Sequence, residues 1–143
     1  QAIAFNLREM ATLRVPIIVT VTGEGGSGGA LAIGVGDRVN MLEFSIYSVI
    51  APESCSAILW RDQKHAVEAA DALKLIPDNL KRWNLVDEII PEPNGGAQND
   101  LEEMAKTLRG VFERQLGELR DVETTDLLEG RYQKFRRMGV FGE

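Results

Sequence analysis

Seven of the chain's 14 glycines lie between Gly23 and Gly36, and we call residues 23–29 the glycine segment. A β-branched run, residues 16–21, precedes it and an apolar run, residues 30–33, follows it. We therefore expect a turn between a strand and a helix, with Ser27 as the helix N-cap. Backbone without Cβ atoms can approach a ligand closely, and N–H groups at a helix start lie at its positive end. The segment is suited to bind negative charge, either permanent or developing in a transition state.

Two short motifs overlap in the glycine segment. Gly23, Gly25 and Gly28 fit the dinucleotide-binding pattern G-x-G-x-x-G, and Glu43 lies near the acidic position that the pattern requires. A dinucleotide fold needs several further alternating strands and helices, whereas the sequence after residue 60 is almost wholly helical in pattern. The dinucleotide interpretation is therefore disfavoured.

The second motif is G-x-S-x-G, residues 25–29, which would make Ser27 a nucleophile. A hydrolase of this kind also needs a later acid and a histidine. The chain's single histidine, His65, lies in a strongly polar stretch expected to face solvent, which disfavours this interpretation. Two interpretations remain open. One is an oxyanion hole made of backbone amides with no side-chain nucleophile, and the other is a glycine turn used only for tight packing.

Length and composition describe one ordinary domain of 143 residues. The formal net charge of −6, from 22 acidic and 16 basic residues, disfavours a dedicated nucleic-acid binder. The single cysteine, Cys55, excludes an internal disulfide, is expected to be packed rather than reactive, and fits a reducing compartment. No apolar run reaches the ~18 residues of a membrane span, and no signal peptide is visible. A cytoplasmic protein is expected, or a stromal one if the chain is from a plastid.

Periodicity predicts helices over residues 3–13, 52–60, 65–74 and 77–85, and strands over residues 39–43, 45–50 and 86–90. Trp60 is expected in the core. Asp87 and Glu88 could be read as a catalytic acid pair, but adjacent strand residues point to opposite faces. We therefore expect both to be structural.

Residues 91–96 form a chain breaker, so the division is a core, residues 1–95, and an amphipathic helical extension, residues 96–143. The extension has helical spacing over residues 101–119 and again after residue 124. Its apolar stripe could pack on the chain's own core or across a subunit interface, and both alternatives stay open. Four basic residues are expected to form a solvated or partner-facing end: Arg131, Lys134, Arg136 and Arg137.

A family resemblance rests on six stretches that occur in order along the chain: residues 1–10, 23–37, 47–53, 58–60, 87–93 and 95–97. Their strand–glycine–helix–strand pattern resembles the ββα spiral of the crotonase (ClpP/crotonase) superfamily, which implies an α/β core with a C-terminal helical extension. Their residues resemble the signature of the carboxyltransferase alpha subunit family of bacterial and plastid acetyl-CoA carboxylase. The chain begins abruptly inside a helical pattern and is expected to be the C-terminal part of such a subunit. Gln98 and the variable stretch 61–65 depart from the family pattern.

The resemblance implies transfer of a carboxyl group from carboxybiotin to acetyl-CoA, giving malonyl-CoA in the first committed step of fatty acid biosynthesis. It implies that the backbone N–H groups of Gly25 and Gly26 hold the biotin oxyanion. Biotin itself would act as the base, which removes the need for a protein acid–base pair. The remaining residues of the segment are expected to form the binding site around these amides: Gly23, Glu24, Ser27, Gly28 and Gly29.

The resemblance also implies partners. They are a carboxyltransferase beta subunit in an alpha2beta2 heterotetramer, the biotin carboxyl carrier protein, and a biotin carboxylase that uses the ATP. The sequence shows no phosphate-loop lysine and no Cys/His metal spacing, so no metal is expected in this chain. Two alternatives stay open. One is another crotonase-type acyl-CoA enzyme, such as a biotin-dependent decarboxylase subunit or a hydratase, and the other is an inactive assembly fragment.

Overall fold

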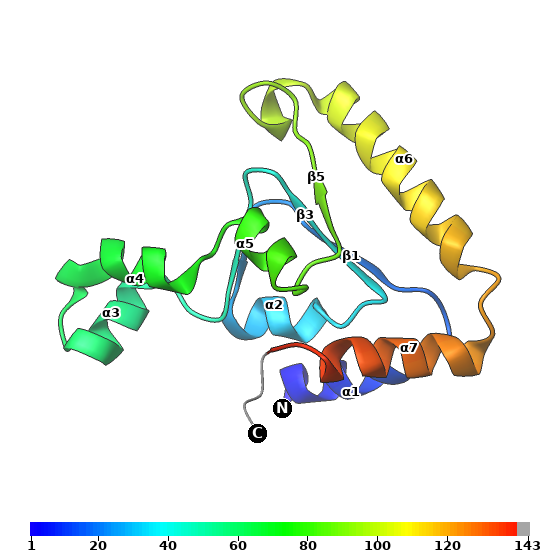
Figure 1. The fold of residues 1–143 in the computed structure, drawn as a ribbon, viewed down its shortest axis with the longest axis horizontal. Coiled ribbons are helices and arrows are strands. Elements are labelled where there is room, and N and C mark those ends of the chain that lie inside the picture. Colours follow the sequence, from blue (N-terminus) through cyan, green and yellow to red (C-terminus); the bar gives the residue numbers. More distant parts are fainter. Residues whose placement is uncertain (140–143) are drawn as a thin grey trace.

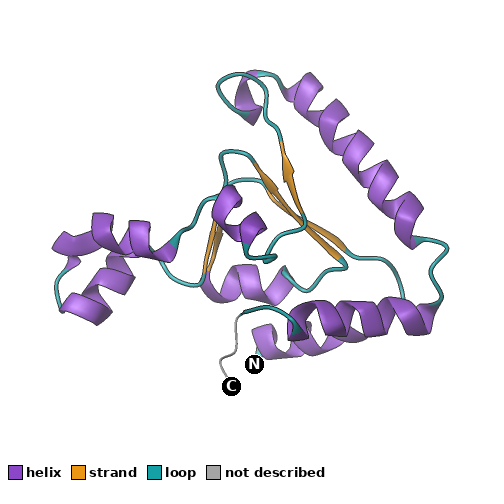
Figure 2. Ribbon diagram, in the orientation of Figure 1, coloured by secondary structure: helices purple, strands orange, loops and turns teal. Residues whose placement is uncertain are grey.

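Two small parallel β-sheets organise the fold, which a computed structural model describes over residues 1–139 (Figures 1 and 2). The larger sheet has the strand order β1 (Ile18–Val21), β3 (Arg38–Leu42), β5 (Glu88–Ile90). The smaller sheet pairs β2 (Glu24–Gly26) with β4 (Ile46–Ser48). Each parallel pair needs a crossover, and the glycine segment with its helix provides the one that returns β1 to β3.

Seven α-helices surround the sheets within the described residues, and Pro52 and Pro77 each begin one of them, as their fixed φ favours. Figure 1 shows α1 and α7 lying side by side beneath the sheets, α6 along one flank, and α3 with α4 projecting as an arm. The strands and helices expected from periodicity are confirmed, apart from shifts at their ends. The helices are α1 (Ala2–Thr12), α2 (Ser27–Ile33), α3 (Pro52–Trp60), α4 (Ala66–Leu73), α5 (Pro77–Arg82), α6 (Leu101–Leu119) and α7 (Thr124–Arg136).

Strand β3 is buried on both faces, and its side chains alternate between two apolar clusters. Val39 and Met41 face α5, where they pack with Leu80. Leu42 faces the other way and packs with Met104 of α6. Of the two alternatives left open for α6, packing on the chain's own core is the one seen among the described residues.

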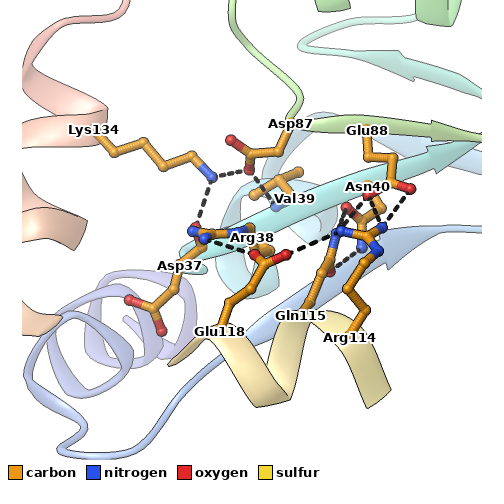
Figure 3. Close-up of polar contacts among 10 residues, drawn as sticks. All are labelled: Asp37, Arg38, Val39, Asn40, Asp87, Glu88, Arg114, Gln115, Glu118 and Lys134. Carbon is orange, nitrogen blue, oxygen red and sulfur yellow. Dashed lines mark hydrogen bonds and ion pairs between the residues drawn. The ribbon is translucent and has the colours of Figure 1, made fainter. Parts of the chain in front are cut away.

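A polar pair lies inside the contact between β3 and α6. Asn40 and Gln115 are almost fully buried, with 0% and 1% of their surface exposed. Each side-chain amide donates to the other's oxygen, both at 2.9 Å, and the Gln115 amide also donates to Glu88 at 2.9 Å (Figure 3). Nη2 of Arg114, on α6, donates to both oxygens of the same carboxylate, at 2.6 and 2.7 Å. These hydrogen bonds fix the rotation of α6 about its axis, because each of them requires a particular direction between donor and acceptor.

The expectation of a solvated basic end is wrong for two of its four residues. The Arg131 side chain is only 2% exposed and pairs with Asp37. Lys134 is largely buried against Asp87 (Figure 3). Burial lowers the pKa of Lys134, and its contact with Asp87 partly opposes that shift. Both residues lie on the face of α7 that packs on the core, whereas Arg136 is exposed.

The expectation that Trp60 belongs to the core is also wrong. Trp60 ends α3 on the projecting arm, is 42% exposed, and stacks on His65 with ring centroids 5.4 Å apart. Ile58 on the same helix is 70% exposed. The arm contacts little beyond itself, so its large apolar side chains find few partners within the described residues. Within residues 1–139, no helix has the length and apolar character needed to cross a bilayer.

Replacing glycines inside α6 is expected to stabilise the chain. A Cβ added at Gly110 or Gly117 meets no atom within 4 Å, so alanine fits without a clash. Glycine inside a helix costs roughly 0.5–1 kcal/mol relative to alanine. We expect Gly110→Ala to raise the free energy of unfolding by that amount in urea denaturation. An unchanged or lowered midpoint would contradict this expectation.

Candidate functional site

The glycine segment is not the simple turn that the sequence suggests. Residues Glu24–Gly26 form a strand, β2, which pairs in parallel with β4 before the helix begins. The N-cap of α2 is Gly26, so the expectation that Ser27 caps the helix is wrong. Ser27 is instead the first helical residue, and its φ of 50° lies in the left-handed region. Non-glycine residues in that region are uncommon and strained, and such strain gathers at functional sites.

The two candidate amides of the segment point in different directions. Ile46 donates its N–H to the carbonyl oxygen of Gly23 at 2.9 Å. In a regular parallel ladder with this register, the peptide groups of Gly25 also face β4, whereas the N–H of Gly26 faces away from it. Gly26 therefore presents the amide that is better placed to meet a ligand.

Gly25 and Gly26 also differ in the free space that a side chain would find. A Cβ on Gly25 would lie 2.9 Å from the Tyr47 ring and 3.1 Å from a methyl group of Val21, so the protein itself fills that space. A Cβ on Gly26 would meet no atom within 4 Å. Gly23 and Gly29 are equally open, and Gly28 is covered only by the end of the Ile3 side chain. The segment thus has a closed position at Gly25 and an open one at Gly26.

An apolar cavity of about 470 Å³ adjoins the glycine segment. Ser27 and Gly28 lie on one wall, and Trp83, Phe135 and Met138 contribute bulky side chains elsewhere in the lining. Pockets of this size and character are typical of small-molecule sites. The other lining residues are Leu31, Gly34, Val39, Tyr47, Ser48, Val49, Leu73, Leu80 and Leu85.

Tyr47 links the cavity to the glycine backbone. Its ring lies against Gly25, and its hydroxyl oxygen would be only 2.6 Å from a Cβ on Gly34. Burial raises the pKa of the Tyr47 phenol, so its hydroxyl stays protonated at neutral pH. A second cavity, of about 570 Å³, shares Tyr47 and Phe135 with the first and extends between α1 and α7.

The remaining sequence candidates lie outside this site. His65 is on the arm, with Nδ1 3.4 Å from Glu68, and Cys55 is half-buried on α3. Asp87 accepts the N–H of Val39 at 2.6 Å and pairs with Lys134, so its role is structural, as expected. Glu88 is equally engaged on the opposite side with α6 (Figure 3). Residues 1–139 hold no group of three or more His, Cys, Asp or Glu side chains that could bind a metal ion.

Sequence reasoning missed the side chains that form the cavity. The sequence places Tyr47 in an expected strand and in one of the stretches that carry the family resemblance, and Phe135 in an amphipathic stripe, but it does not indicate that either side chain lines a cavity. For Tyr47 the available signal is the spacing of the glycines. Gly25 and Gly34 leave room that a large side chain must fill, and Tyr47 is the aromatic residue on the strand beside them. Trp83 and Met138 have no comparable signal. A large apolar residue in an expected helix gives the same sequence pattern whether it packs in the core or lines a cavity.

Two solved structures, a malonate decarboxylase and a transcarboxylase, have a similar fold. A Pseudomonas malonate decarboxylase hetero-tetramer, in complex with coenzyme A, matches 94% of this chain and 56% of its own at 20% identity, with a TM-score of 0.62. Transcarboxylase 12S matches 62% of this chain and 19% of its own at 19% identity, with a TM-score of 0.53. At these identities the likeness concerns the fold alone, and it confirms the crotonase-like α/β class.

The family follows from the sequence comparison. The model for acetyl co-enzyme A carboxylase carboxyltransferase-like proteins matches residues 1–139, so the chain belongs to that family. Over its full length it is 60% identical to the acetyl-coenzyme A carboxylase carboxyl transferase subunit alpha of Geobacter metallireducens, and 54% identical to that of Thermosynechococcus vestitus. It spans 45% and 44% of the length of these relatives.

Proposed function

We propose that the chain is part of a carboxyltransferase alpha subunit that, with a beta subunit, moves a carboxyl group from carboxybiotin to acetyl-CoA and forms malonyl-CoA. The observation that carries this proposal is the exposed Gly26, whose N–H faces away from β4 and which directly precedes Ser27 on the wall of an apolar cavity of about 470 Å³. The names of the relatives support it, and no catalytic side chain is needed near the segment. Biotin carboxyl carrier protein would deliver the cofactor, and biotin carboxylase would use the ATP.

The residues present fit a biotin ring. Open space over Gly26 admits a polar oxygen, and the cavity next to it offers apolar walls for a flat ring system and its aliphatic arm. Carboxybiotin, when bound, supplies the carboxyl group and, after losing it, a nitrogen base. The chain's own contribution would be positional and electrostatic. The N–H of Gly26 would donate to the ureido oxygen and stabilise negative charge there, and the missing side chain at Gly25 leaves room for the Tyr47 ring.

The size of this contribution is set by preorganisation. One fixed donor in a hydrolase oxyanion hole is worth ~2.7–4 kcal/mol, because it needs no reorganisation when charge appears. Apolar walls raise that value by excluding water. Sites for coenzyme A and for the enolate of its acetyl group are assigned to the beta subunit, which would leave the alpha chain a half-site.

The direct test is malonyl-CoA-dependent carboxylation of free biotin, the reverse reaction, with the full-length subunit alone and with a beta subunit. We expect carboxybiotin only when both subunits are present. Release of carbon dioxide from malonyl-CoA without any carboxybiotin would favour a decarboxylase instead. Absence of both products from a folded pair would overturn the carboxyltransferase proposal and leave the fold class untouched.

A further inference from the structure

The buried Arg131 uses all five of its N–H donors on fixed acceptors. Nε and Nη2 donate to the Asp37 carboxylate at 2.9 and 2.8 Å. Nη1 donates to the carbonyl oxygens of Met10 and Leu13, both at 2.9 Å, and Nη2 also donates to the carbonyl oxygen of Val15 at 2.9 Å. One side chain of α7 thus holds the end of α1 and the chain that leads into β1. We call these five hydrogen bonds of Arg131 the clamp. A lysine could not reproduce this planar fork.

The Asp37 carboxylate continues the connection into the sheet. Its Oδ2 accepts the N–H of Ile17 at 2.7 Å, while the N–H of Asp37 donates to the carbonyl oxygen of Ile17 at 2.8 Å. Ile17 directly precedes β1, which runs into the glycine segment, and Asp37 follows α2, which leaves it. Both chain segments that flank the glycine segment therefore meet at Arg131.

Two further contacts bring α7 and α1 to the glycine segment itself. The end of the Ile3 side chain, on α1, lies 2.8 Å from where a Cβ of Gly28 would be. Phe135, one turn after Arg131 on α7, lines the cavity beside Ser27 and Gly28. Figure 1 shows α1 and α7 running together below α2, in keeping with these contacts.

We propose that Arg131 is a positioning residue for the candidate site: it sets the place of the glycine segment relative to α1 and α7. It touches no reacting atom and acts through Asp37 and the carbonyl groups before β1. Its effect on catalysis rests on the proposed function, whereas its effect on the placement of the segment does not. A side chain that only stabilised α7 would change unfolding without changing the segment in the folded state.

The test compares Arg131→Lys with Leu127→Ala in the full-length subunit. Leu127 is 6% exposed and lies one turn earlier on α7, so its truncation also destabilises the helix but leaves the clamp intact. Arg137→Lys, at an exposed position, serves as a neutral control. The first readout is amide hydrogen exchange of residues 23–29 under native conditions, with the variants matched in fraction folded by choice of temperature. The second is KM for free biotin and kcat with the beta subunit.

We expect exchange at residues 23–29 to rise about tenfold in Arg131→Lys and to stay within about twofold in the two control variants. We expect KM for biotin to rise with kcat/KM falling by ~10–100-fold, because a shift of about 1 Å in a site is enough for such a loss. Equal exchange in Arg131→Lys and Leu127→Ala would overturn the proposal.

A second variant, Asp37→Asn, tests the same proposal if Arg131→Lys does not fold. Asp37→Asn keeps the shape of the side chain and leaves the three carbonyl contacts of Arg131 in place, and we expect the same increase in exchange at residues 23–29. Unchanged exchange in Asp37→Asn would count against the clamp. Increased exchange together with a wild-type pair that transfers no carboxyl group would refute the proposed function and support the positioning role.

Discussion

The Gly26→Val variant is expected to fold as the wild-type chain does and to lose at least ~100-fold in carboxyl transfer, the scale of losing one oxyanion donor. Gly26 has φ −130° and ψ 144°, an extended conformation that β-branched residues favour. Its Cβ would meet no atom of the protein within 4 Å. The added side chain therefore enters open space next to the amide, and we expect it to crowd the proposed ligand oxygen.

The matched control for this variant is one residue away. Gly25→Ala places its Cβ 2.9 Å from the Tyr47 ring, and overpacking of this kind costs ~1–3 kcal/mol. We expect Gly25→Ala to lower the urea midpoint and Gly26→Val to leave it nearly unchanged. Carboxylation of free biotin by each variant with the beta subunit is the activity measurement. Full activity in Gly26→Val would remove the amide of residue 26 from the mechanism.

The Gln115→Leu variant is expected to lose about 2–4 kcal/mol of stability, because it leaves both the donor and the acceptor of the Asn40 amide unpaired in the interior. Asn40 is fully buried, so water cannot replace the lost partner. Glu88 would lose one hydrogen bond as well. Leucine has a similar volume, which keeps the effect to the polar groups. Urea denaturation followed by circular dichroism measures the change.

A double variant separates pairing from packing. Replacing both members, Asn40→Leu with Gln115→Leu, removes the unpaired groups, and we expect it to recover much of the loss seen in Gln115→Leu alone. Gln133 on α7, whose side-chain amide donates to Glu129 in the same helix, is the control. A loss in Gln115→Leu no larger than that in Gln133→Leu would show that the buried pair contributes little.

Much of the architecture could be predicted from local pattern. The β-branched run before the glycines, the prolines at helix starts and the breaker at residues 91–96 each have a local physical cause, so they were placed correctly. Strand β2 escaped prediction because glycines disfavour strands, and its pairing with β4 is a tertiary effect. Alternation along a strand predicts that Asp87 and Glu88 point to opposite faces and are structural, but it does not predict their partners.

The buried polar residues of the extension could not be assigned from residue type. Gln115 continues the spacing of Met104, Leu108 and Val111, and that position was the available signal of its burial. Arg131 follows Leu127 by one helical turn in the same way. A charged or amide side chain at such a position is usually taken as solvent-facing, and only the presence of a partner such as Asp37 or Asn40 decides otherwise.

The clamp around Arg131 joins residues far apart in sequence, so it forms late during synthesis on the ribosome. Asp37 emerges 94 residues before the arginine that neutralises it, and at ~5–20 residues per second the wait is roughly 5–20 s. Strand β3 meets β1 early, but its other edge stays open until β5 is made. For that interval the nascent chain presents an unpaired strand edge beside an uncompensated carboxylate. Until β5 covers that edge, the charge is well placed to discourage its association with other nascent chains.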